Sequence, residues 1–84
     1  MSPYIPREHR ISHTPTSSLA APTSGVLNFQ ITELLKEYVR HHGTSYDTLN
    51  AVVGALGCVK AEFYRRVVAP YEDLKRAENG DVYP

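Results

Sequence analysis

Hydrophobic and polar positions follow a helical period over two long stretches of the chain. In the first stretch, bulky apolar side chains recur at three- and four-residue steps, at Leu27, Ile31, Leu34, Leu35 and Tyr38. This spacing places them on one face of an α-helix. Thr23 or Ser24 is a suitable cap before the stretch, and Gly43 supplies a left-handed stop after it. We therefore expect a first helix over about residues 26–42.

The second stretch, residues 45–69, has two different faces. Its bulky face carries Tyr46, Leu49, Val53, Leu56, Lys60, Phe63 and Val67. Its other face is nearly free of side chains and carries Asn50, Gly54, Gly57 and Ala61. Each glycine costs about 1 kcal/mol relative to alanine inside a helix. Close approach of another helix is the usual compensation, so this small-residue stripe predicts an oligomer interface. The alternative is a tolerated weak spot.

The short link between the two stretches predicts an antiparallel helical hairpin. Gly43 and Thr44 leave room for a tight turn only. Ser45 with Thr48, or Thr44 with Asp47, resembles a capping box for the second helix. The bulky faces are expected to meet across the hairpin, through Leu34, Leu35 and Tyr38 on one side and Leu49, Val53 and Leu56 on the other.

The two ends of the chain have a different character. Residues 1–24 carry four of the six prolines, which predicts an extended or flexible arm, with order expected near Tyr4 and Ile5. Pro70 breaks or kinks the second helix, or begins another. Residues 70–78 form a short charged helix in this interpretation. The predicted fold is all-α: a hairpin of about 26–42 and 45–69, a C-terminal helix of about 70–78, and an arm (1–24) beside a small helical domain (25–84).

Composition narrows the classes of function. The chain has 84 residues and a formal net charge of zero, which disfavours a general nucleic-acid or membrane-surface binder. A single cysteine fits a reducing compartment, and no apolar run approaches the roughly 20 residues needed to cross a bilayer. We expect a cytoplasmic protein without a membrane partner. Because so short a chain builds only a marginal core, we also expect a homo-oligomer.

The charged and aromatic residues around Pro70 are the candidate ligand-binding site. No metal-ligand set, P-loop or nucleophile–base pair is visible, so we expect no catalytic residues, no cofactor, no metal and no enzyme. Residues 59–69 hold two more basic than acidic residues, and residues 70–84 hold two more acidic than basic ones. Either the arginines pair with Glu72 or Asp73, or they bind phosphate or carboxylate while a tyrosine stacks on a base. The candidate site residues are Tyr64, Arg65, Arg66, Tyr71 and Glu72.

Several segments resemble those of a family of small uncharacterised proteins from bacteriophages, prophages and bacteria. The similarity is carried by the run from Lys60 to Lys75, by residues 78–83, by Pro3-Tyr4-Ile5, and by motifs at 27–32 and 46–56. The resemblance carries no known activity. Our leading hypothesis is a non-enzymatic binding protein, which in a phage setting would sequester a nucleotide second messenger of host defence in the host cytoplasm without hydrolysing it. The alternative is a structural or adaptor protein that uses the same residues to self-assemble or to dock a host or virion protein.

Overall fold

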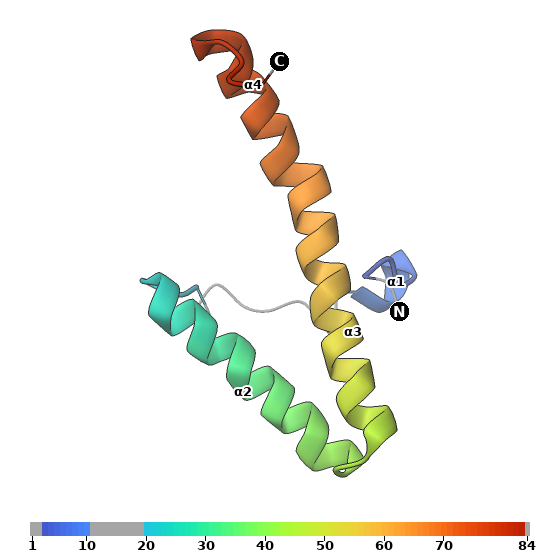
Figure 1. The fold of residues 1–84 in the computed structure, drawn as a ribbon. Coiled ribbons are helices and arrows are strands. Elements are labelled where there is room, and N and C mark those ends of the chain that lie inside the picture. Colours follow the sequence, from blue (N-terminus) through green and yellow to red (C-terminus); the bar gives the residue numbers. More distant parts are fainter. Residues whose placement is uncertain (1–2, 11–19, 84) are drawn as a thin grey trace.

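The fold is entirely helical in the part of the chain that the computed structural model describes, residues 3–10 and 20–83 (Figure 1). The elements are α1 (Arg7–Arg10), α2 (Ser24–His42), α3 (Tyr46–Phe63), the π-helix η3 (Tyr64–Val68) and α4 (Ala69–Asn79). The all-α prediction and the hairpin of α2 and α3 are confirmed. Residues 11–19 of the predicted arm lie outside the described residues, and the division of the chain at residue 24 stays a prediction.

The ends of the two hairpin helices are fixed by local hydrogen bonds. Thr23 caps α2, because its hydroxyl accepts from the backbone N–H of Val26 at 3.2 Å. Gly43 ends the helix with φ 86°, a conformation that favours glycine, and its N–H donates to the Val39 carbonyl. Ser45 then caps α3 by accepting from the N–H of Thr48 at 3.1 Å. The turn therefore follows the predicted stop and cap signals.

The contact between α2 and α3 differs in part from the predicted one. The residues that are not exposed are Gln30, Leu35 and Val39 on α2, and Thr48, Ala51, Val52, Gly54, Ala55, Cys58 and Glu62 on α3. Two residues expected at the contact are largely exposed, Leu34 at 70% and Val53 at 68%. Leu34 and Val53 therefore lie outside the contact, and that part of the predicted pairing was wrong. Leu35, which was also predicted at the contact, is half-buried. The half-buried side of α3 includes the small residues Ala51 and Ala55, which lets α2 approach closely near the turn.

The two helices diverge from the turn and form an open V (Figure 1). Within residues 3–10 and 20–83, no apolar side chain is buried. The radius of gyration is 16.7 Å, against about 12 Å for a compact domain of this length. The hairpin therefore leaves broad surfaces of both α2 and α3 exposed.

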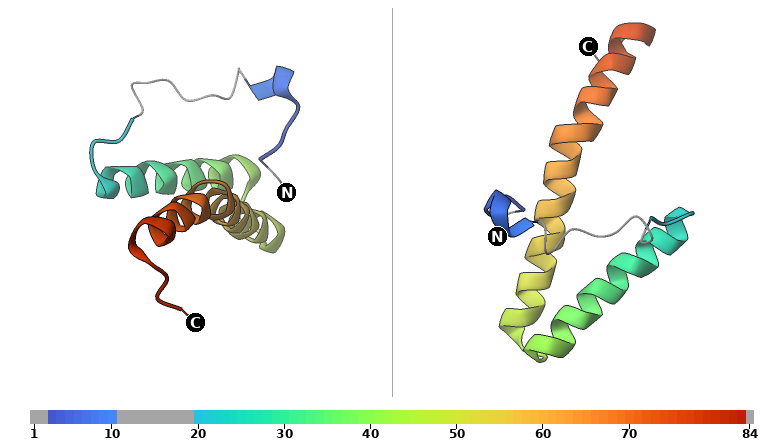
Figure 2. Two further views of the ribbon diagram at one scale, coloured as in Figure 1. Left: turned by 90° about the horizontal axis from the view of Figure 1, so that it is seen from above. Right: turned by 180° about the vertical axis from the view of Figure 1, so that it is seen from behind.

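The N-terminal segment reaches the long helix through Tyr4, which precedes α1 and donates its phenol proton to the carboxylate of Glu62 on α3. In the left view of Figure 2, α1 itself stands away from the rod. The side chain of Arg10 donates from Nε to the carbonyl of Ile5 at 2.8 Å, which folds the segment back on itself. The predicted order near Tyr4 and Ile5 stays a prediction. In the described part of the chain, no helix is long and apolar enough to span a membrane.

Candidate ligand-binding and assembly site

Pro70 is accommodated in a continuous helical rod by a wider turn that precedes it. Proline has no N–H to donate, and its ring clashes with the carbonyl four residues earlier in a regular α-helix. In η3, the N–H of Ala69 donates to the carbonyl of Tyr64, five residues earlier, which is the π-helical pattern. The chain then continues as α4, with Pro70 in its first turn. The predicted C-terminal helix therefore extends the second hairpin helix in a single rod.

The π turn brings two predicted site residues together. Tyr64 donates its phenol proton to the carboxylate of Glu72 at 2.8 Å, although the two are eight residues apart. Eight residues along an α-helix would place them about 80° apart around the axis, and the extra residue of a π turn reduces this to about 20°. The hydrogen bond to Glu72 raises the pKa of Tyr64. Tyr64 and Glu72 thus form a clasp across the π turn.

Arg65 pairs with a carboxylate on the preceding turn, one that the sequence interpretation did not single out. Its guanidinium lies 3.0 Å from Glu62, and the phenol of Tyr4 donates to the same carboxylate. Arg65 first, and then Tyr4, hold the pKa of Glu62 below its usual value, and the same ion pair raises the pKa of Arg65. The three-residue spacing of Glu62 and Arg65 is the signal that would have identified this pair.

The acidic residues after Pro70 do not pair with Arg65 or Arg66 of the same chain. Asp73 lies 3.3 Å from Arg76, and Asp81 lies 3.8 Å from the same guanidinium. Glu72 is the acceptor for Tyr64. The expected intrachain pairing of Arg65 or Arg66 with Glu72 or Asp73 was therefore wrong, because side chains one turn away are closer partners.

Arg66 differs from the other arginines of helices α2 to α4. Arg40, Arg65 and Arg76 each have a carboxylate within 4 Å. Among the described residues, no ion pair or hydrogen bond involves the Arg66 side chain, and the residue is exposed. Its nearest influence on a carboxylate is electrostatic, since its charge adds to the effects of Arg65 and Tyr4 in lowering the pKa of Glu62. The N–H groups of its planar guanidinium are therefore available to an anion.

Tyr71 completes the set of predicted ligand residues. It is 60% exposed, and the Lys75 ammonium lies 5.6 Å from the centre of its ring. This is a cation–π contact across one turn of α4. Tyr64, also exposed, stands on the other side of Pro70. Two aromatic rings are thus available for stacking on either side of the arginines.

Neither of two hollows formed by the described residues is lined by a predicted ligand residue. Both hollows lie on α2. The more apolar one is lined by Leu27, Phe29, Gln30, Ile31, Glu33, Leu34 and Glu37. Phe29 was missed in the sequence, because it lies outside the apolar period of that helix.

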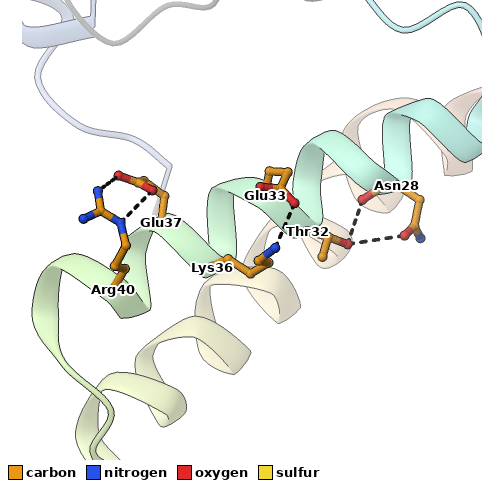
Figure 3. A network of polar contacts seen from close by, with 6 residues as sticks. All are labelled: Asn28, Thr32, Glu33, Lys36, Glu37 and Arg40. Atoms are coloured by element: carbon orange, nitrogen blue, oxygen red, sulfur yellow. Dashed lines mark hydrogen bonds and ion pairs between the residues drawn. The ribbon is translucent and has the colours of Figure 1, made fainter.

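The outer face of α2 carries the solvated charges that the sequence predicts. Lys36 lies 3.1 Å from Glu33, and Arg40 donates from Nε to Glu37 at 3.1 Å, as Figure 3 shows. Thr32 donates back to the carbonyl of Asn28 at 2.9 Å. The Arg40 hydrogen bond lowers the pKa of Glu37. All of these side chains make their contacts within α2, which is typical of a solvent-facing surface.

The small-residue stripe of α3 lies outside the hairpin contact. Asn50, Gly57 and Ala61 are exposed, and Gly54 is half-buried. A Cβ atom added at Gly57 would meet nothing within 4 Å. The stripe is open to a second chain, and its role as an oligomer interface stays a prediction.

The fold and this segment define a small helical-hairpin protein whose charged and aromatic residues lie along a single exposed rod. A family model described as a domain of unknown function (DUF6899) matches residues 1–82. The chain belongs to that family. The comparisons with curated proteins and with solved structures found no match.

Proposed function

We propose that this protein is a non-enzymatic binding protein that acts as a homo-oligomer and holds an anionic small molecule where its subunits meet. The observation that carries the proposal is Arg66, the exposed arginine of helices α2 to α4 that lacks a carboxylate among the described residues. An exposed guanidinium that is not paired with a carboxylate favours a phosphate or carboxylate ligand, because it offers several N–H donors in a planar fork.

The neighbouring aromatic residues favour a nucleotide among the anions. Tyr64 and Tyr71 flank Arg66 along the rod, and both are more than half exposed. Tyrosine rings stack on nucleobases while an arginine binds the phosphate. The ligand class that we propose is a nucleotide second messenger of host immunity, sequestered by a phage-encoded protein in the host cytoplasm.

A second subunit is part of this proposal for a geometric reason. Arg66, Tyr64 and Tyr71 lie on the surface of one rod, and a ligand on such a surface would be contacted from one side only. Small-molecule sites usually bury most of their ligand in a concave pocket. A neighbouring chain would supply the opposite wall.

Calorimetry with a panel of cyclic dinucleotides and ADP-ribose derivatives tests the proposal. The unmodified chain is expected to bind a member of the panel. Arg66→Ala is expected to weaken that binding by about one to two orders of magnitude, which corresponds to the free energy of a charged hydrogen bond. Arg40→Ala is the matched control, since it removes an arginine from the solvated face of α2. Failure of the unmodified chain to bind any member would overturn the nucleotide proposal.

An adaptor that docks a host or virion protein is the second candidate function. The apolar hollow on α2, with Leu34 70% exposed, favours it. Leu34→Lys separates the two proposals, because it would abolish docking of a protein partner on α2 and leave nucleotide binding at Arg66 unchanged.

A further inference from the structure

The bulky face of α3, continued by Val67 of η3, is left uncovered by the other described residues. Its apolar members, here called the α3 stripe, are Tyr46, Leu49, Val53, Leu56, Phe63 and Val67, and all of them are exposed. Leu49, Val53 and Leu56 lie about 100–160° around the helix from Ala51 and Ala55, at 100° per residue. Since the hairpin contact uses Ala51 and Ala55, another helix can lie on the α3 stripe without displacing α2.

The exposed area of the stripe matches what a stable dimer requires. Tyr71 continues the stripe into α4. Together, the side chains of the stripe and of Tyr71 expose on the order of 800 Å², if each large side chain has about 150–250 Å² when fully exposed. A standard protein–protein interface buries about 800 Å² on each partner. The small-residue stripe offers much less apolar area, because glycine has no side chain.

The spacing of the apolar residues along the stripe favours another helix with the same spacing as its partner. With Lys60 between Leu56 and Phe63, the positions on this face alternate steps of three and four residues, the pattern of positions a and d in a coiled-coil heptad. Lys60 and Tyr46 occupy a positions and Phe63 a d position, and a single lysine at a specifies the register at a cost in stability. Val53 and Val67 then occupy a positions, and Leu49 and Leu56 occupy d positions. β-Branched residues at a with leucine at d favour two parallel strands.

We propose that a second copy of this chain packs in parallel on the α3 stripe. The π turn supports this arrangement, because its extra residue turns the following helix back by about 100°. Tyr71, and not Pro70, is thereby aligned with Phe63. The apolar seam continues past the proline into α4.

The parallel pairing would complete the site proposed above, and to that extent the inference rests on the proposed function. The seam is the line of a and d positions along which the two helices would touch. Arg66 immediately precedes Val67 at an a position, and Tyr64 immediately follows Phe63 at a d position. The two residues therefore border opposite edges of the seam. In parallel coiled coils, opposite edges of the two helices meet. Arg66 of one copy would therefore face the Tyr64–Glu72 clasp of the partner subunit, and each edge would hold one guanidinium beside one aromatic ring and the Glu72 carboxylate. An anionic ligand at this site would compete with Glu72 for Arg66.

Cysteine cross-linking of the full chain tests the pairing without any ligand. In a Cys58→Ala background, Leu49→Cys and Leu56→Cys each place a thiol on the stripe, and Ala61→Cys places the matched control on the small-residue stripe. In a parallel pair, each position on the seam meets its own copy. Mild oxidation is expected to convert most of both seam variants, and little of the control, to a dimer on a non-reducing gel.

Three results would overturn the inference. Cross-linking of Ala61→Cys in preference to the seam variants would place the interface on the small-residue stripe. Cross-linking of Leu49→Cys only when it is mixed with Val67→Cys would show an antiparallel pair. Absence of cross-linking in both seam variants, with the helical circular dichroism retained, would show that no second copy lies on the stripe. Because these readouts involve no nucleotide, they are independent of the calorimetric test of the proposed function.

Discussion

At the scale of single residues, two carboxylates organise the segment around Pro70. Glu72 accepts the phenol proton of Tyr64, and Glu62 accepts from both Tyr4 and Arg65. Exposed ion pairs of this kind add little to stability on their own. Their effect is positional, because one fixes the π turn and the other holds the N-terminal segment on α3.

The first prediction concerns the titration of Tyr64. Glu72 favours the neutral phenol and so raises its pKa above the usual value of about 10. The contribution of this contact to stability is therefore present below pH 10 and is lost as the pH rises through the raised pKa. Nuclear magnetic resonance should show Tyr64 ionising at higher pH than in Glu72→Gln. An unchanged Tyr64 titration in that variant would contradict the clasp.

The second prediction concerns the N-terminal segment. The pKa of Glu62 is lowered by Arg65 and then by Tyr4, so the contact is present above about pH 4.5 and is lost as the pH falls through the lowered pKa. Glu62→Gln at neutral pH should reproduce the acid state and speed amide hydrogen exchange in residues 4–10. Glu33→Gln, which removes an equivalent pair on α2, should leave that exchange unchanged. Equal exchange in both variants would show that Glu62 does not hold the segment.

At the scale of elements, the sequence predicts the existence of the helices and their ends well. Apolar spacing, Thr23, Gly43 and Ser45 are local signals, and each acts within one turn of the chain. The face through which each helix packs was harder to predict, because bulky apolar side chains identify an apolar stripe but do not indicate which neighbouring element covers it. The π turn was not predictable in detail, since Pro70 signals a disturbance that a break, a kink or a wider turn could relieve equally.

The third prediction tests the start of α3. Ser45→Ala removes the hydroxyl that accepts from the Thr48 N–H at 3.1 Å and should cost about 1 kcal/mol, which is typical of an N-cap. Thermal melting followed by circular dichroism measures the loss. Thr44→Ala is the control, because Thr44 lies next to the cap without supplying it. A larger loss for Thr44→Ala would show that the cap is assigned to the wrong residue.

At the scale of the whole molecule, the described chain exposes the surfaces that normally form a core. The open V leaves the α3 stripe uncovered, and within residues 3–10 and 20–83 no apolar side chain is buried. The sequence placed the candidate ligand residues in one segment, but it could not show how they meet. Arg65 has its own partner in Glu62, whereas Arg66 has no carboxylate within 4 Å among the described residues, and a second chain beside it is part of our proposal.

Sedimentation equilibrium of the full chain, unmodified and with Val53→Asp, tests most directly whether the protein assembles through the α3 stripe. The unmodified chain should have at least twice the mass of one chain, and Val53→Asp should shift it toward a single chain, because a carboxylate buried in the seam lacks a partner. Ala61→Asp, with the same charge on the small-residue stripe, should keep the mass of the unmodified protein. A single-chain mass for the unmodified protein, or loss of assembly in Ala61→Asp alone, would contradict this account.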